Sequence, residues 1–168
     1  MIVEEREYAR LLGYPWGTLL EGEVRSRAEE AAEWYERHCT PLVYCVDAVT
    51  AITAGAAVDR ETARLWDSGR VDEAYFLDRY AAAVVEKLAA ELGPHQKPGT
   101  GDLAFEEQWT LFEVIKPLNP EIAMLPSGML TPKNSVLAFV KRGAPDVQES
   151  NPCTKCNMPG CSFRRKTA

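Results

Sequence analysis

The sequence predicts one α+β domain, in which helices pack around a small, mostly antiparallel sheet, followed by a short cysteine-rich tail. Several segments carry apolar residues at helical spacing, and two short runs are rich in β-branched and aromatic residues. Three cysteines lie close together near the C-terminus. A chain of 168 residues is long enough to bury a core without disulfide bonds. We therefore assign residues 1–148 to the α+β domain and residues 149–168 to the tail.

Three segments are predicted to be helical because their apolar residues recur every three or four positions among charged ones. They are residues 23–37, 59–66 and 72–92. The longest segment ends at Gly93, since glycine commonly follows the last turn of a helix.

Two strands and one further helix complete the predicted domain. Residues 42–52 are expected to form one continuous buried strand, and residues 135–140 a strand that is buried on both faces. Between them, the polar loop 95–101 leads into a helix that opens near Asp102, a suitable N-cap residue. The buried face of that helix is predicted to consist of Phe105, Trp109, Phe112 and Ile115.

The composition excludes several classes of protein. A net charge of −6 argues against nucleic acid as a partner, because phosphate binding requires a basic face. No apolar run is long enough for a membrane span, and the charged N-terminal residues do not fit a secretory signal. An odd number of cysteines, five, argues against a secreted disulfide framework. We therefore expect a cytoplasmic protein that binds neither nucleic acid nor a membrane.

The tail carries the spacing Cys-x2-Cys-x4-Cys at Cys153, Cys156 and Cys161. Three thiolates on one short loop can converge on a single zinc ion or iron–sulfur cluster, and the sequence does not distinguish the two. Zinc would act as a structural clip, whereas a cluster would relay electrons. A fourth ligand would have to come from elsewhere, and Cys39 is the first candidate and Cys45 the second.

Three segments of the sequence, taken in order, resemble those of a known family. They are Leu-Asp-Arg-Tyr-Ala-Ala-Ala-Val-Val-Glu at 77–86, the Lys-Pro-Gly-Thr-Gly-Asp loop with the helix that follows it at 97–112, and Leu-Pro-Ser-Gly-Met-Leu-Thr-Pro-Lys-Asn-Ser-Val at 125–136. Together they resemble the activation (reactivation) domain of vitamin B12-dependent methionine synthase, and more closely its small stand-alone relatives. Some of those relatives also end in a cysteine tail followed by Phe-Arg-Arg.

The resemblance implies an α+β fold that binds S-adenosylmethionine in a shallow groove and helps to restore oxidised cobalamin. In that family an electron reduces the cobalt, and a methyl group from S-adenosylmethionine traps the reduced state. The implied partner is a corrinoid-dependent methyltransferase or corrinoid protein. That partner would supply the cobalamin, because this chain has no Asp-x-His-x-x-Gly segment to ligate cobalt.

The resemblance also implies the ligand-binding residues. Glu86 matches a glutamate that contacts the ligand, and an acidic side chain beside a groove suits the cationic groups of S-adenosylmethionine. Asp78 lies two turns earlier and would extend an acidic face. A role for Ser127 rests on the resemblance alone. The loop whose backbone would lie along the ligand consists of Lys97, Pro98, Gly99 and Thr100.

Two hypotheses about function follow. In the first, the chain is an accessory protein that binds S-adenosylmethionine and supports reductive reactivation of a corrinoid-dependent methyltransferase. In the second, it is a non-enzymatic scaffold, stabilised by zinc or an iron–sulfur cluster, that docks on a corrinoid protein. The Pro-Gly loop and Glu86 favour the first. The second is favoured because the family's loop arginine has no clear counterpart and Thr100 replaces its tyrosine.

Overall fold

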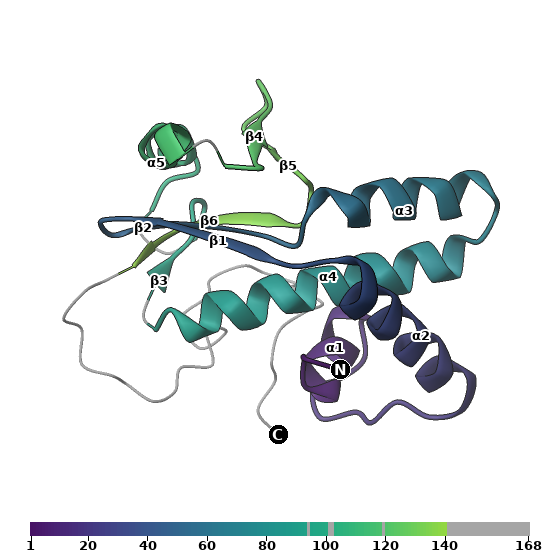
Figure 1. Cartoon of the computed structure of the whole chain (residues 1–168). Helices are drawn as coiled ribbons and strands as arrows, with labels where there is room; N and C mark the ends of the chain where they lie inside the picture. The colour runs from purple at the N-terminus through teal and green to yellow at the C-terminus, as the bar shows by residue number, and fades with distance from the viewer. Residues whose placement is uncertain (94, 101–102, 119, 141–168) are drawn as a thin grey trace.

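The computed structural model describes residues 1–93, 95–100, 103–118 and 120–140. Within these ranges the chain forms five α-helices, a four-stranded antiparallel sheet and a small two-stranded sheet (Figure 1). The predicted α+β architecture is thus confirmed. The proposed division at residue 148 and the three tail cysteines lie outside the described residues, so both stay predictions.

Helix α4 (Val71–Glu91) is the centre of the helical layer and packs against α1, α2 and α3. Its predicted apolar stripe is confirmed, since Leu77, Ala81 and Val84 are buried. Gly93 follows it with a φ of 77°, the left-handed conformation that glycine adopts without strain. The other helices of this layer are α1 (Glu5–Leu11), α2 (Gly22–His38) and α3 (Ala56–Asp67).

The larger sheet has the strand order β1-β2-β6-β3, formed by Leu42–Val46, Val49–Thr53, Ser135–Val140 and His95–Gln96. The predicted continuous strand over 42–52 is wrong, because the chain reverses between β1 and β2. Asp47 has a φ of 52°, a conformation that aspartate tolerates better than most residues, and it permits a two-residue turn in which Val46 pairs with Val49. The edge strand β1 therefore exposes every second side chain, including Cys45, whereas β2 is buried throughout.

Helix α5 (Glu107–Ile115) begins later than the sequence predicted. Of its four predicted core residues, Phe112 and Ile115 are buried, but Phe105 and Trp109 are exposed. Phe105 precedes the first helical turn, and Trp109 lies at the margin of the apolar stripe, so neither faces the sheet. Leu111 takes the third buried position.

The sheet separates two apolar cores. Helix α4 lies on one side of it, and α5 lies on the other together with the hairpin of β4 (Ala123–Met124) and β5 (Leu130–Thr131) (Figure 1). The central strand β6 contributes Leu137 and Ala138, which are fully buried as predicted. No helix in the described ranges is both long enough and apolar enough to cross a bilayer.

Three buried tyrosines fix α1 and α2 against α4. Tyr80 packs edge-to-face on Tyr8 and Tyr35, with ring centroids 5.1 and 5.5 Å away. The Tyr80 hydroxyl donates to Oε1 of Glu36 at 2.6 Å, and the Tyr8 hydroxyl donates to the carbonyl oxygen of Phe76 at 2.7 Å. Because each buried hydroxyl has a partner, the cluster stabilises the fold. It also sets the position of α1 against α4, at Phe76 and Tyr80.

Candidate functional site

The structure brings together two of the predicted ligand residues, Glu86 and Lys97. Glu86 lies on α4, and Lys97 directly follows β3, which returns along the sheet by pairing with β6. The Lys97 Nζ atom lies 2.7 Å from Oε1 of Glu86. The Glu86 side chain keeps 44 % of its surface exposed, so the ion pair is accessible to a ligand.

Glu86 is held as a carboxylate by nearby positive charge. Burial acts to raise the pKa of Glu86. The opposing effects of Lys97, Arg10 and His95 are larger, so the pKa lies below its ordinary value. Arg10 is itself 8 % exposed and donates through Nε to Oε2 of Glu7 at 3.0 Å. The site therefore combines the Glu86 carboxylate with Lys97 and with Arg10, which is itself paired with Glu7.

Arg10 was missed by the sequence analysis because α1 was not predicted. The signal that could have revealed α1 is the apolar spacing of Tyr8, Leu11 and Leu12 after two glutamates. In the sequence, Arg10 lies between two apolar residues, Ala9 and Leu11. The structure buries both of these neighbours, and Arg10 is buried with them.

The loop after Lys97 is a tight, internally bonded turn. Pro98 and Gly99 occupy its centre, Gly99 has a φ of 79°, and the Thr100 amide donates to the Lys97 carbonyl at 3.0 Å. The Thr100 hydroxyl also donates to that carbonyl at 2.6 Å, and the Gly99 amide donates to Leu103 at 2.9 Å. The turn is thus preorganised, and a ligand would meet its surface and carbonyl oxygens rather than these amides.

Exposed aromatic side chains connect this turn to the segment that contains Ser127. The Phe105 ring lies against Gly99, where an added Cβ atom would be 3.8 Å from the ring. Phe105 packs edge-to-face on Trp109 at 5.7 Å, and the Trp109 indole covers Gly128. The β4–β5 hairpin, whose turn contains Ser127, therefore lies on the α5 side of the sheet, whereas α4, which carries Glu86, lies on the other side (Figure 1).

Asp78, the other predicted acidic residue, belongs to a different part of the molecule. Its carboxylate lies 2.9 Å from Nζ of Lys133 and accepts a hydrogen bond of 3.0 Å from Nδ2 of Asn134. Burial acts to raise its pKa, but Lys133 and Arg79 outweigh burial and the net direction is downward. Asp78 anchors the segment before β6, and each of the two predicted acidic residues has its own lysine.

The two cysteines proposed as a fourth metal ligand differ in environment. Burial raises the pKa of Cys39 to about 11, which disfavours the thiolate that a metal requires. Cys45 is exposed on β1, with Sγ 3.5 Å from the hydroxyl oxygen of Thr50. Across the described residues, no three metal-binding side chains gather. The tail site at Cys153, Cys156 and Cys161 and its fourth ligand stay predictions.

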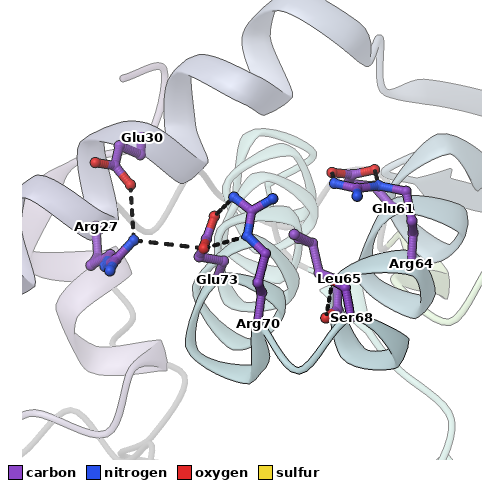
Figure 2. Close-up of polar contacts among 8 residues, drawn as sticks. All are labelled: Arg27, Glu30, Glu61, Arg64, Leu65, Ser68, Arg70 and Glu73. Atoms are coloured by element: carbon purple, nitrogen blue, oxygen red, sulfur yellow. Dashed lines mark hydrogen bonds and ion pairs between the residues drawn. The ribbon is translucent and has the colours of Figure 1, made fainter.

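A cavity of about 240 Å³ lies between α2, α3 and α4. Several of the side chains that line it are charged and form ion pairs with one another (Figure 2). Arg27 lies 3.4 Å from Glu30 and 3.7 Å from Glu73, and Arg70 also pairs with Glu73. Because Arg27 comes from α2 and Glu73 from α4, these contacts join the two helices. We interpret the cluster as a structural clamp.

Replacing Glu73 with glutamine should remove a pH-dependent part of the stability. The hydrogen bond from Arg70 lowers the pKa of Glu73, and Arg27 lowers it further. A carboxylate with a lowered pKa stabilises the folded state above its ordinary pKa of 4.5, and this contribution is lost as the pH falls. At pH 7 we expect Glu73→Gln to cost about 0.5 kcal/mol, and the cost should be smaller at pH 3, below the ordinary pKa of the carboxylate.

Urea denaturation at the two pH values measures this difference. The control is Glu33→Gln on α2, because the exposed Glu33 carboxylate makes only a long ion pair of 4.0 Å with Arg37 among the described residues. A cost for Glu73→Gln that does not change with pH would contradict the role assigned to the ion pairs.

The comparisons with known proteins show a likeness of fold. No protein-family model matches the chain, and no curated protein matches its sequence. Among solved structures, the chain is similar to the crystal structure of the MetH reactivation domain bound to AdoHcy, with a TM-score of 0.50 and 15% sequence identity. The match covers 57% of this chain and 39% of that one, so the chain spans well under half of the length of its relative. The chain is thus similar in fold to the MetH reactivation domain.

Proposed function

We propose that this chain is an accessory protein for the reductive reactivation of a corrinoid-dependent methyltransferase, and that it binds S-adenosylmethionine at Glu86 and Lys97. The observation that supports the proposal is an accessible ion pair beside a rigid Pro-Gly turn. The pair lies in a fold similar to that of a reactivation domain crystallised with AdoHcy.

An ion pair of this kind is complementary to the amino-acid end of S-adenosylmethionine. The ligand's ammonium group would donate to the Glu86 carboxylate, and its carboxylate would accept from Lys97. The amino-acid end is a zwitterion, so each side chain of the internal pair would exchange one charged partner for another of the same sign. The sulfonium adds one positive charge, which suits the Glu86 carboxylate. The positive charge of Arg10 keeps Glu86 ionised and adds to the attraction for the ligand carboxylate.

The rest of the ligand would follow the turn around the β3 edge of the sheet. Gly99 is two residues from Lys97, at most about 7 Å away along the chain. The exposed Phe105 ring beside Gly99 supplies an aromatic surface for the adenine, in place of the family's tyrosine at Thr100. Because internal hydrogen bonds already fix the turn, binding would order few further groups.

The reactive groups would be divided between two proteins. S-adenosylmethionine supplies a methyl group, and the cobalamin is supplied by the partner. In this proposal Glu86 and Lys97 fix the amino-acid end of the methyl donor. The tail cysteines Cys153, Cys156 and Cys161 would hold zinc or an iron–sulfur cluster that stiffens the docking surface or relays the electron.

A second candidate function is a scaffold that docks on a corrinoid protein without binding S-adenosylmethionine. The observation that favours it is a set of exposed apolar side chains just before α5, on α5 and in the β4–β5 hairpin, which are Phe105, Trp109, Leu125 and Met129. Apolar side chains grouped in this way are typical of protein interaction sites. In that case the pair of Glu86 and Lys97 would only attach the Pro-Gly turn to α4.

A titration of S-adenosylmethionine followed by heteronuclear NMR separates the two candidates. The proposed site predicts saturable shifts of the amide signals of Glu86, Lys97, Gly99 and Phe105. The signal of Asp59, on α3, should stay in place. If none of the four signals moves, the methyl-donor role is wrong and the scaffold remains.

A further inference from the structure

We propose that a second cavity, between α3 and α4, binds a small organic cation with an aromatic or apolar body. The cavity has a volume of about 360 Å³, and Lys133, just before β6, is one of the residues that line it. It lies about 12 Å along α4 from Glu86, measured from Asp78 by helical rise, so it is separate from the proposed methyl-donor site. A volume of this size accommodates a small ligand.

One end of the cavity is acidic. Asp59 Oδ2 accepts a hydrogen bond of 2.9 Å from the Lys133 amide, but Oδ1 is buried and has no hydrogen-bond partner among the described residues. None of the ion pairs in the described ranges includes Asp59, whereas Asp78 is neutralised by the Lys133 ammonium and by Arg79. Because no ion pair among the described residues neutralises the Asp59 carboxylate, the Asp59 side of the cavity favours a ligand that carries positive charge.

The other end of the cavity is aromatic. Trp66, on the last turn of α3, is 62% exposed, and Tyr75, on the first turns of α4, is 44% exposed. The Tyr75 hydroxyl donates to the Leu12 carbonyl at 3.1 Å, which fixes the ring. The guanidinium of Arg79 already lies 5.8 Å from the centroid of that ring. Tryptophan attracts cations more strongly than tyrosine does, so the open Trp66 face is the better surface for a ligand cation.

These two ends define the ligand class. The Asp59 carboxylate would attract the positive charge of the ligand from one end of the cavity, and the Trp66 ring would contact the part of the ligand that lies at the other end. A neutral analogue would lose the attraction to the carboxylate, and an anion would be repelled by Asp59. The lining alanines, Ala63 and Ala74, leave room for an apolar body between the helices.

The experiment is an NMR titration of the full chain with benzylammonium, benzyl alcohol and benzoate, followed at the indole N–H of Trp66. We expect saturable binding of benzylammonium, at least about tenfold weaker binding of benzyl alcohol, and none of benzoate. Asp59→Asn and Trp66→Ala should each weaken benzylammonium binding at least about fivefold, with the tyrosine-ring contact retained in both. For Trp66→Ala the readout is the amide of Ala63.

Matched variants separate a specific loss from misfolding or from the other site. Asp67→Asn removes an exposed charge from the same helix and Trp66→Phe keeps an aromatic ring, so both should bind benzylammonium nearly as the parent does. Glu86→Gln should also bind it unchanged. Equal binding of the three probes, or an unchanged affinity in Asp59→Asn, would overturn the proposal. Tighter binding of a lysine-rich peptide than of benzylammonium would also overturn it, in favour of a protein partner.

Discussion

Replacing Gly128 with alanine is expected to lower the free energy of unfolding by about 2–4 kcal/mol. Gly128 has a φ of 83°, which strains any residue with a Cβ atom. An added Cβ would also lie 2.4 Å from Cη2 of Trp109, well inside van der Waals contact. Both effects act on the same residue, so the Trp109 indole must move or the turn must change. Urea denaturation measures the loss.

Two further variants distinguish the two causes. Gly17 has a φ of 87° with open space around it, so Gly17→Ala shows backbone strain alone and should cost about 1 kcal/mol. Combining Gly128→Ala with Trp109→Ala removes the clash between the added Cβ atom and the indole. The double variant should therefore lose less free energy of unfolding than the two single variants lose together. If Gly128→Ala costs no more than Gly17→Ala, the tight contact between the β4–β5 hairpin and α5 is wrong.

The second large effect is expected on ligand affinity. Glu86→Gln should weaken S-adenosylmethionine binding at least about tenfold, because a hydrogen bond between two charged groups becomes one to a neutral amide. Lys97→Met should weaken it by a similar factor through loss of the carboxylate partner. The double variant should lose more than the sum of the two single losses, because each single substitution also removes the cost of breaking the internal pair and so hides part of its own effect.

The control for this series is Glu113→Gln. Glu113 is exposed on α5 and pairs with Lys116 at 2.9 Å, so the substitution removes an equivalent ion pair away from the site. It should leave the affinity unchanged. A Glu86→Gln protein that folds normally and binds with unchanged affinity would remove Glu86 from the site.

Three of the helices, α2, α3 and α4, were predicted well because their information is local. The apolar stripe of α4 and its stop at Gly93 depend on side-chain spacing and on one glycine, and both are visible in the sequence. The reversal at Asp47 was missed because a two-residue turn without glycine leaves no strong mark between two β-branched runs. The exposure of Phe105 and Trp109 was missed because it depends on where α5 begins and on Gly128, which contacts the indole from another part of the chain.

The candidate site could be predicted only in part, because it depends on contacts between segments that are far apart in the sequence. Glu86 and the turn after Lys97 were identified through the order of sequence segments. Their ion pair depends on the pairing of β3 with β6, which no local pattern encodes. Arg10 reaches the site because α1 packs on α4, and Asp78 pairs with Lys133, which is 55 residues away in sequence. Contacts between distant segments thus decided which predicted residues meet.

Calorimetric titration of S-adenosylmethionine into protein purified without oxygen tests the central claim most directly. The claim predicts saturable one-to-one binding in the parent chain, with the heat strongly reduced in Glu86→Gln and retained in Glu113→Gln. No measurable heat at ligand concentrations up to about 1 mM would contradict it. The free energy of binding would then be weaker than about −4 kcal/mol, which corresponds to a Kd above about 1 mM.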